Sequence, residues 1–301
     1  MVGKPFASHT PSLKQVFGEY HMPDQATMHG SVTRAKYDEL PGINWSVLKH
    51  CLEHPAKAIH ELGEPKKTSS RMILGQAVHA LCLEGESIYK NRFAVAPEKI
   101  DRRTTAGKEE WSRFESASNN KSIITVSDNR TVKEVCDSIK NHPAASDLLT
   151  SGSPETAITW EIMDRLYGKG IIDMLPHGDG PIVDLKTTRD ASPSGFARQI
   201  ANYKYAGQAC YYRRGLSTLM GEAPRDFVII AVEVEAPYCV GVYRLNEDAI
   251  DSGERMVDMC IDRWLAATRG QQGFAPHYTD YIEDLGVPVW AMANENSNVV
   301  A

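Results

Sequence analysis

Hydrophobic and polar residues alternate in two short runs near the middle of the chain. Residues 170–175 are Gly-Ile-Ile-Asp-Met-Leu and residues 181–188 are Pro-Ile-Val-Asp-Leu-Lys-Thr-Thr, joined by a Pro-His-Gly-Asp-Gly turn. Such runs, bounded by turn residues, predict two neighbouring β-strands. Because alternate side chains of a strand share a face, Asp184 and Lys186 should point one way and the apolar residues beside them the other. Asp173 on the first strand can face the same point.

The rest of the chain has a helical pattern in its first half and a strand-rich pattern after about residue 156. Apolar stripes and capping residues predict helices that begin at Asn44 or Ser46 and at His54, and that cover about 69–84, 106–117, 128–141, 194–201, 203–219 and 248–268. Apolar runs predict further strands over 92–96, 123–126, 156–166, 226–234 and 238–245. The predicted fold class is α/β, with a mixed central sheet flanked by helices.

The domain organisation predicted from this pattern is simple. Residues 31–290 should form one folded domain, because they contain no repeat and no low-complexity linker. The polar segments 1–30 and 291–301 should be flexible. The chain has no apolar run long enough to span a membrane and no apolar block near Met1, so we expect a cytoplasmic protein without a membrane partner.

Composition excludes some classes of protein. The chain has 301 residues, a formal net charge of −6 and 42% hydrophobic residues. This charge disfavours a simple nucleic-acid coat protein, which depends on phosphate neutralisation, but it is compatible with a nuclease that concentrates basic residues locally. The six cysteines are scattered without a Cys-x-x-Cys pair, so we expect reduced thiols and neither structural zinc nor a disulfide framework.

The chemistry suggested by the two central strands is metal-dependent phosphodiester hydrolysis. Two carboxylates, Asp173 and Asp184, flanking one position are what a hard cation such as Mg²⁺ requires. Lys186 beside them can stabilise a phosphoryl oxygen or hold an attacking water. The alternative is a surface hairpin with solvated charges. The apolar residues around the acids favour buried strands instead, where charges persist only when paired or metal-bound.

Other residues carry weaker signals. His79 lies one turn after Gly75 on a predicted helix, where it is either a core histidine or a further metal ligand. Gln208 and Tyr212 are four residues apart and share a helix face, which is either a polar edge or a lining of the site. Glu161 is a candidate of the same ambiguous kind, in the predicted strand that precedes Asp173.

A basic loop precedes the helix predicted at 106–117. It contains Arg102, Arg103 and Lys108, with threonines between them. The simplest interpretation is a solvated helix start with a threonine N-cap. In a nuclease the same residues would bind DNA, since guanidinium groups, hydroxyls and helix-terminal amides together can hold a phosphate.

The motifs together resemble a known nuclease family. Their order along the chain is similar to that of the RecB-like branch of the PD-(D/E)xK nucleases: Gly75 and His79, then Asp173, then Asp184 and Lys186, then Gln208 and Tyr212. Within that branch the chain resembles the C-terminal nuclease domain of the RecE exonucleases, also called exonuclease VIII. The stretches 93–98, 102–110 and 183–188 carry this second resemblance.

The resemblance implies a role for each of these residues. His79, Asp173 and Asp184 would be metal ligands, joined by the backbone carbonyl of Leu185. Lys186 would position or activate the water, and Gln208 and Tyr212 would line the active site. The implied cofactor is Mg²⁺, replaceable by Mn²⁺, with two ions per site.

The resemblance also implies a biological activity. It is the 5′ to 3′ degradation of one strand of linear double-stranded DNA, which leaves 3′ single-stranded overhangs for phage-type recombination. The implied partners are double-stranded DNA ends, further copies of the chain in a ring-shaped homo-oligomer, and a RecT-like single-strand annealing protein. Two alternatives stay open: a structure-specific or single-strand DNA nuclease, and a non-catalytic DNA-binding module of the same fold.

Overall fold

The computed structural model describes residues 26–64, 68–98, 100–119, 121–150, 152–163, 166–269 and 273–288. The predicted flexible tail, 291–301, lies outside the described residues, as does the predicted flexible N-terminal segment up to residue 25. The last residues of that N-terminal segment are regular, because β1 covers Thr27–Ser31 and pairs with a strand of the central sheet. A short polar segment gives no sequence signal for pairing at the edge of a sheet, because such pairing depends on the neighbouring strand.

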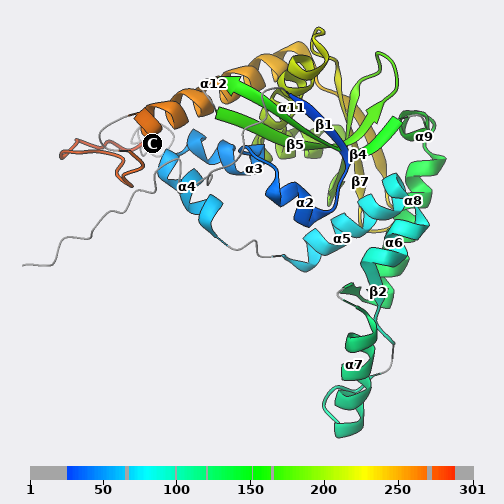
Figure 1. The fold of residues 1–301 in the computed structure, drawn as a ribbon. Helices are drawn as coiled ribbons and strands as arrows, with labels where there is room; N and C mark the ends of the chain where they lie inside the picture. The colour runs from blue at the N-terminus through cyan, green and yellow to red at the C-terminus, as the bar shows by residue number, and fades with distance from the viewer. Residues whose placement is uncertain are drawn as a thin grey trace, which may run out of the picture.

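The centre of the structure is a six-stranded sheet with the order β1-β4-β5-β6-β7-β8 (Figure 1). Strands β6 and β7 are parallel, and the other neighbours in the sheet are antiparallel. The prediction of a mixed sheet is therefore confirmed. The remaining strands of the sheet are β4 (Gly152–Met163), β5 (Leu166–Pro176), β6 (Ile182–Thr188), β7 (Phe227–Glu233) and β8 (Val240–Arg244).

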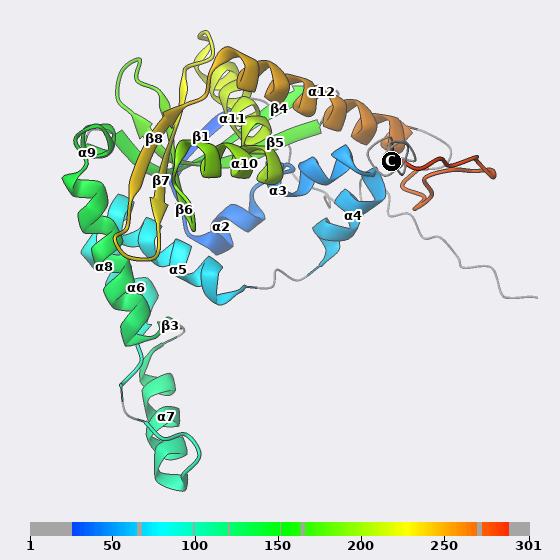
Figure 2. The ribbon, with the colours of Figure 1, turned by 180° about the vertical axis from the view of Figure 1, so that it is seen from behind.

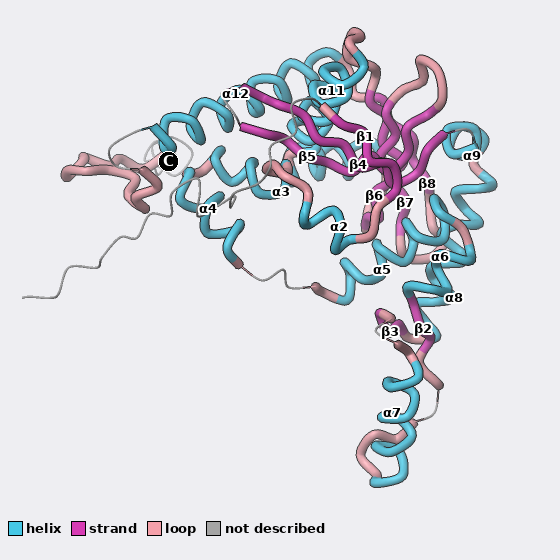
Figure 3. The backbone as a smooth tube through the Cα atoms, in the orientation of Figure 1, coloured by secondary structure: helices cyan, strands magenta, loops and turns pink. Residues whose placement is uncertain are grey.

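Helices surround the sheet on both faces (Figure 3). Across the described residues, no helix has the length and the apolar character needed to cross a membrane. The helices are α2 (Arg34–Glu39), α3 (Trp45–Leu48), η1 (Lys49–Leu52), α4 (Pro55–Gly63), α5 (Ser70–His79), η2 (Ala80–Glu84), α6 (Glu86–Arg92), α7 (Thr105–Ala117), α8 (Val126–Asn141), α9 (Pro143–Thr150), α10 (Pro193–Tyr203), α11 (Tyr205–Met220) and α12 (Glu247–Arg269).

The two larger hydrophobic cores lie on opposite faces of the sheet, and strand β6 contributes to both. Ile182 packs in the first core, which includes residues of α3, α10, α11 and α12. Val183 and Leu185 pack in the second core, which includes residues of α5 and α8. The alternation expected from the sequence is thus confirmed, because a strand sends successive side chains to opposite faces. Asp184 is on the face of Ile182 and α11.

Capping residues fix where the helices begin. Asn44, rather than Ser46, caps the first predicted helix, since its side chain accepts a hydrogen bond from Val47 N at 3.1 Å. Thr104 caps α7 in the same way through Gly107 N. Asparagine and threonine are favoured at this position because a side-chain oxygen satisfies an N–H that the helix leaves unpaired.

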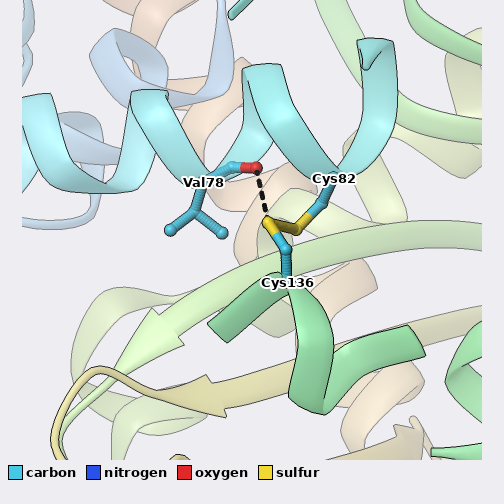
Figure 4. Close-up of a disulfide and its surroundings, with 3 residues drawn as sticks. All are labelled: Val78, Cys82 and Cys136. Carbon is cyan, nitrogen blue, oxygen red and sulfur yellow. Dashed lines mark hydrogen bonds between the residues drawn. A yellow bond between two sulfur atoms is a disulfide. The ribbon is translucent and has the colours of Figure 1, made fainter. Parts of the chain in front are cut away.

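The predicted helix over 69–84 changes its winding at His79. Helix α5 ends there, and the π-helical turn η2 follows. Cys82 of η2 forms a disulfide with Cys136 of α8, with 5.5 Å between the two Cα atoms (Figure 4). The expectation of reduced thiols is therefore wrong for this pair. Their 54-residue separation carries no sequence signal, because it is the packing of η2 on α8 that brings the two sulfurs together.

A slender extension, which we call the arm, consists of β2 (Phe93–Val95), α7 and β3 (Ser122–Ile124). Strands β2 and β3 pair in parallel, and their buried residues Phe93 and Ile124 join the second core. Helix α7 stands beyond them, away from the six-stranded sheet (Figures 1 and 3).

Candidate active site

Strands β5 and β6 pair at one position in the described residues, Met174 with Val183. Further along β6, the backbone N–H and carbonyl of Leu185 form hydrogen bonds with side chains instead of with the backbone of β5. Its N–H donates to Asp173 Oδ2 at 2.8 Å, and its carbonyl accepts from His79 Nε2 at 2.9 Å. An acid and an imidazole thus replace the backbone hydrogen bonds that would continue a regular ladder. The Leu185 carbonyl, expected as a metal ligand, here holds the imidazole.

Three side chains converge at this gap. His79 Nδ1 lies 3.3 Å from Glu155 Oε1 and 3.8 Å from Asp173 Oδ2. One donor atom from each residue lies within 4.8 Å of the other two, and the three form a group that could hold a metal ion. Two of these residues, His79 and Asp173, were predicted from the sequence as ligands.

Glu155 was missed by the sequence analysis. In the β4–β5 ladder Pro154 pairs with Met174 and Thr156 with Ile172, so Glu155 and Asp173 stand between these pairs. The backbone of Glu155 has φ +47°, an uncommon value for a residue other than glycine. Local strain of this kind is frequent where a side chain has to be aimed at a functional site.

Asp184, the third predicted ligand, accepts the hydrogen bonds of a second network beside this group. Its Oδ1 accepts from Lys186 Nζ at 2.8 Å and from Gln208 Nε2 at 2.9 Å. Its Oδ2 lies 2.6 Å from Lys186 Nζ but, in the described part of the chain, accepts no hydrogen bond. Only 4% of the Asp184 side chain is exposed, so this oxygen is a buried acceptor with capacity for a further ligand.

Burial and neighbouring charges shift the protonation equilibria of these groups. Burial raises the pKa of Asp184 to about 6 against the attraction of Lys186, and Asp173 adds to the rise. Burial alone would lower the pKa of His79, but Asp173 and Glu155 raise it to about 9. Asp184 and Asp173 likewise outweigh burial and raise the pKa of Lys186 above its usual value. Lys186 is therefore a cation, suited to hold a water or an anionic oxygen rather than to accept a proton.

Small residues allow the helices to approach the strands. A Cβ on Gly75 would lie 3.3 Å from Thr187 Oγ1, so β6 lies close against α5 there. A Cβ on Gly170 would lie 2.6 Å from the ring of Tyr212, so α11 lays this tyrosine directly on β5. Tyr212 and Gln208 both line a cleft of about 290 Å³ that also includes Asp173 and Glu155 among its walls.

Glu161 lies elsewhere. It is opposite Tyr167 in the β4–β5 ladder, six residues along β4 from Glu155, which corresponds to about 20 Å of strand. There it lines a different cleft, together with Trp160 and Arg214. The structure does not bring this candidate to the site.

The basic residues of the arm are also distant from the site. Arg103 is 91% exposed and pairs with Asp101 at 2.9 Å, and the guanidinium of Arg102 lies 4.2 Å from the ring centre of Trp111. Lys108 is exposed on α7. The interpretation as a capped helix start holds, and α7, which this loop precedes, stands away from the six-stranded sheet (Figure 1).

The donor atoms of the gap fit a divalent cation. Two carboxylates and one imidazole suit Mg²⁺ or Mn²⁺, the imidazole favouring the second. The hydrogen bond from His79 Nε2 to a backbone carbonyl fixes the ring so that Nδ1 faces the acids, as is usual for histidines that ligate metals. The buried acceptor on Asp184 lies in the adjacent network.

Comparison with known proteins gives two matches of different kinds. Residues 44–284 match the family model described as "PDDEXK-like domain of unknown function (DUF3799)". Among solved structures, the crystal structure of "Putative exonuclease" from Eubacterium rectale is similar to this chain. The TM-score is 0.55 and the identity 12%, over 88% of this chain and 99% of that one. At an identity this low, the similarity shows a shared fold and nothing about function. No curated protein sequence matches the chain.

Proposed function

Because this chain belongs to the DUF3799 family of PDDEXK-like domains, we propose that it is a nuclease that uses Mg²⁺ to hydrolyse phosphodiester bonds in DNA. The observation that carries the proposal is the meeting of two networks at the gap between β5 and β6. One is the group of His79, Glu155 and Asp173, and the other is the pair of Asp184 with Lys186. A metal site beside a buried cation matches the needs of phosphodiester hydrolysis.

Each residue of the site has a task in this chemistry. His79, Glu155 and Asp173 would hold the metal, and Asp184 could join them through Oδ2, which accepts no hydrogen bond in the described residues but lies next to Lys186. The metal, when bound, lowers the pKa of a bound water and stabilises negative charge on the leaving oxygen. Lys186 keeps its proton and donates to a water or to a non-bridging phosphate oxygen. Gln208 holds Asp184 Oδ1 and so keeps this carboxylate oriented.

The resemblance to the RecE exonucleases supports a finer proposal. The substrate is linear double-stranded DNA, one strand is degraded from 5′ to 3′, and the site would hold two Mg²⁺ ions. The chain works as a ring-shaped homo-oligomer, and a RecT-like annealing protein receives the 3′ overhang. A ring would make digestion processive, because an enclosed duplex cannot leave sideways.

The test is digestion of end-labelled linear duplex in Mg²⁺, with closed circular DNA of the same sequence as the second substrate. The linear duplex should be shortened progressively from its 5′ ends, and the circle should persist. Asp184→Ala should abolish cleavage. Asp179→Ala is the matched control, since Asp179 is exposed in the turn that joins β5 and β6.

Each outcome separates the candidates. Rapid cutting of closed circular DNA would establish an endonuclease and rule out the ring-shaped oligomer. Preference for single strands or for branched ends would favour the alternative substrates. If Asp184→Ala cuts as fast as the wild type, the assignment of the active site is wrong.

A further inference from the structure

A row of stacked aromatic rings runs from the first core to the cleft. The ring of Tyr243 stacks on Phe196 at 5.7 Å between centres, and Phe196 lies 6.1 Å from Tyr205. Tyr205 stacks on Tyr203 at 5.6 Å, with 25° between the ring planes. Phe196 is 1% exposed, whereas Tyr203 is 55% exposed. The row thus ends in an aromatic ring at the surface.

The backbone holds this last ring in place. Tyr203 ends α10 and Tyr205 begins α11, and Lys204 between them adopts the left-handed conformation at φ 62° (Figure 2). The Lys204 carbonyl accepts from Trp45 Nε1 at 3.1 Å. A Cβ on Gly207 would come within 2.1 Å of the Trp45 ring, so only glycine permits this packing. A non-glycine residue in this conformation persists where its surroundings enforce it.

The end of the row lies beside the reacting groups. Tyr203 and Tyr205 line the same cleft as Asp173 and Glu155, and Lys186 Nζ lies 5.1 Å from the centre of the Tyr205 ring. Lys49 lines this cleft too. The cleft therefore offers an exposed aromatic ring and a lysine next to the site of hydrolysis.

We propose that Tyr203 stacks on an unpaired nucleobase of the strand being cut, while Lys49 contacts the adjoining phosphate. Every base has a flat face, and a tyrosine ring beside a cation is the usual means of binding single-stranded nucleic acid without sequence preference. A base inside a duplex already stacks on both sides, so the strand must separate from its complement before it reaches Tyr203. This inference rests on the proposed nuclease function and specifies the form in which the strand is bound.

The experiment uses short single-stranded DNA that carries the fluorescent base 2-aminopurine at one position, scanned along the strand, in EDTA. Stacking should quench the fluorescence at one or two positions in the wild type and in Tyr203→Phe. Tyr203→Ala should lose the quenching and bind roughly tenfold more weakly, the effect of one lost base–aromatic stack. Tyr281→Ala, which removes an exposed tyrosine outside the cleft, should behave as the wild type.

Strands that lack the base at the quenched position separate stacking from general weakening. The wild type should bind such a strand as weakly as Tyr203→Ala does, and Tyr203→Ala should lose nothing further, because two changes to one contact are not additive. Lys49→Ala should weaken both kinds of strand equally. The second readout is the KM in Mg²⁺ for a duplex with a few unpaired terminal nucleotides, which Tyr203→Ala should raise and Tyr203→Phe should not.

The failures are distinguishable. If the wild type cuts DNA and Tyr203→Ala has unchanged quenching and KM, the stacking role is wrong and the proposed function stands. The stacking role is also wrong if Tyr203→Ala weakens intact and base-less strands to the same extent. If the wild type neither binds nor cuts DNA, the proposed function itself fails, and this inference fails with it.

Discussion

The candidate active site at the gap between β5 and β6 and the basic loop of the arm are both rich in charge, yet their charges have opposite surroundings. In the active site, Lys186 is 19% exposed and pairs with an aspartate that is 4% exposed. In the arm, Arg103 is 91% exposed and its partner Asp101 is 48% exposed. A solvated pair is worth little, whereas a buried group has its charge state set by its partners.

The partners also differ in their distance along the chain. Arg103 contacts a residue two positions away, while His79 contacts Leu185 and Glu155, which are 106 and 76 positions away. A contact between distant segments exists only when the whole fold is in place. Residues joined in this way are the better candidates for chemistry, because the fold is what fixes their geometry.

The largest effect that the comparison predicts concerns two lysines. Lys186→Ala should lower the cleavage rate roughly a hundred- to a thousandfold, the usual loss when one donor to a developing charge is removed. Lys108→Ala removes the same charge from the arm and should leave the rate unchanged. Single-turnover rates in Mg²⁺ measure both. Equal rates for the two variants would show that the active site and the arm do not differ in this way.

The next effect concerns two glutamates of β4. Glu155→Ala removes a donor of the metal group, so the Mg²⁺ concentration needed for half-maximal rate should rise at least about tenfold. Glu161→Ala, six residues further along the same strand, should leave it unchanged. Cleavage rates of both variants, measured over a titration of Mg²⁺, test this. A dependence on Glu161 and not on Glu155 would reverse the assignment.

A third prediction concerns pH and the metal-free protein. Asp173 and Glu155 raise the pKa of His79 from 6.5 to about 9 despite its burial. A raised pKa means that the folded protein binds this proton more tightly than the unfolded chain does. The stabilisation is therefore complete below pH 6.5 and is lost as the pH rises through about 9, by about 1 to 3 kcal/mol.

Urea unfolding in EDTA at pH 6 and at pH 9.5 measures this change, with His79→Gln as the reference. The wild type should lose more free energy of unfolding than His79→Gln does between the two values. If both proteins lose the same amount, His79 is not the imidazolium that the two acids imply.

The smallest effect belongs to the arm. Removing Arg102 and Arg103 together should weaken DNA binding roughly fivefold or less, since both side chains are exposed and already occupied by protein partners. The salt dependence of binding should flatten slightly. Asp101→Asn, which frees Arg103, should act in the opposite direction. A loss as large as that of Lys186→Ala would show that the arm reaches the reacting phosphate.

Short-range pattern was enough to predict part of the site. Asp184 and Lys186 follow from the alternation of a single strand, and the turn after residue 175 places Asp173 on its neighbour. The mixed α/β fold follows from apolar runs that predict strands and from apolar stripes with capping residues that predict helices. Gln208 lies near Asp184 because its helix packs on the face of β6 that carries this acid.

The choice between Glu155 and Glu161 needed the register of β4 on β5. Both are acids of β4, but the strand predicted from the sequence begins at residue 156 and so leaves Glu155 out. Counting back from the end of β4 pairs Glu161 with Tyr167 and sets Glu155 across from Asp173. A register is fixed by the hairpin and by packing, so the sequence alone does not assign it.

The disulfide between Cys82 and Cys136 closes the chain segment that contains the arm into a covalent loop. These residues bracket the whole arm, and Cys82 is the third residue after His79. Closing a loop of this length stabilises a fold by about 4 kcal/mol, because the disulfide lowers the conformational entropy of the unfolded chain. A break of the backbone within the arm would leave the two fragments covalently joined. The disulfide thus closes the arm into a loop and fastens η2, which directly follows His79, to α8.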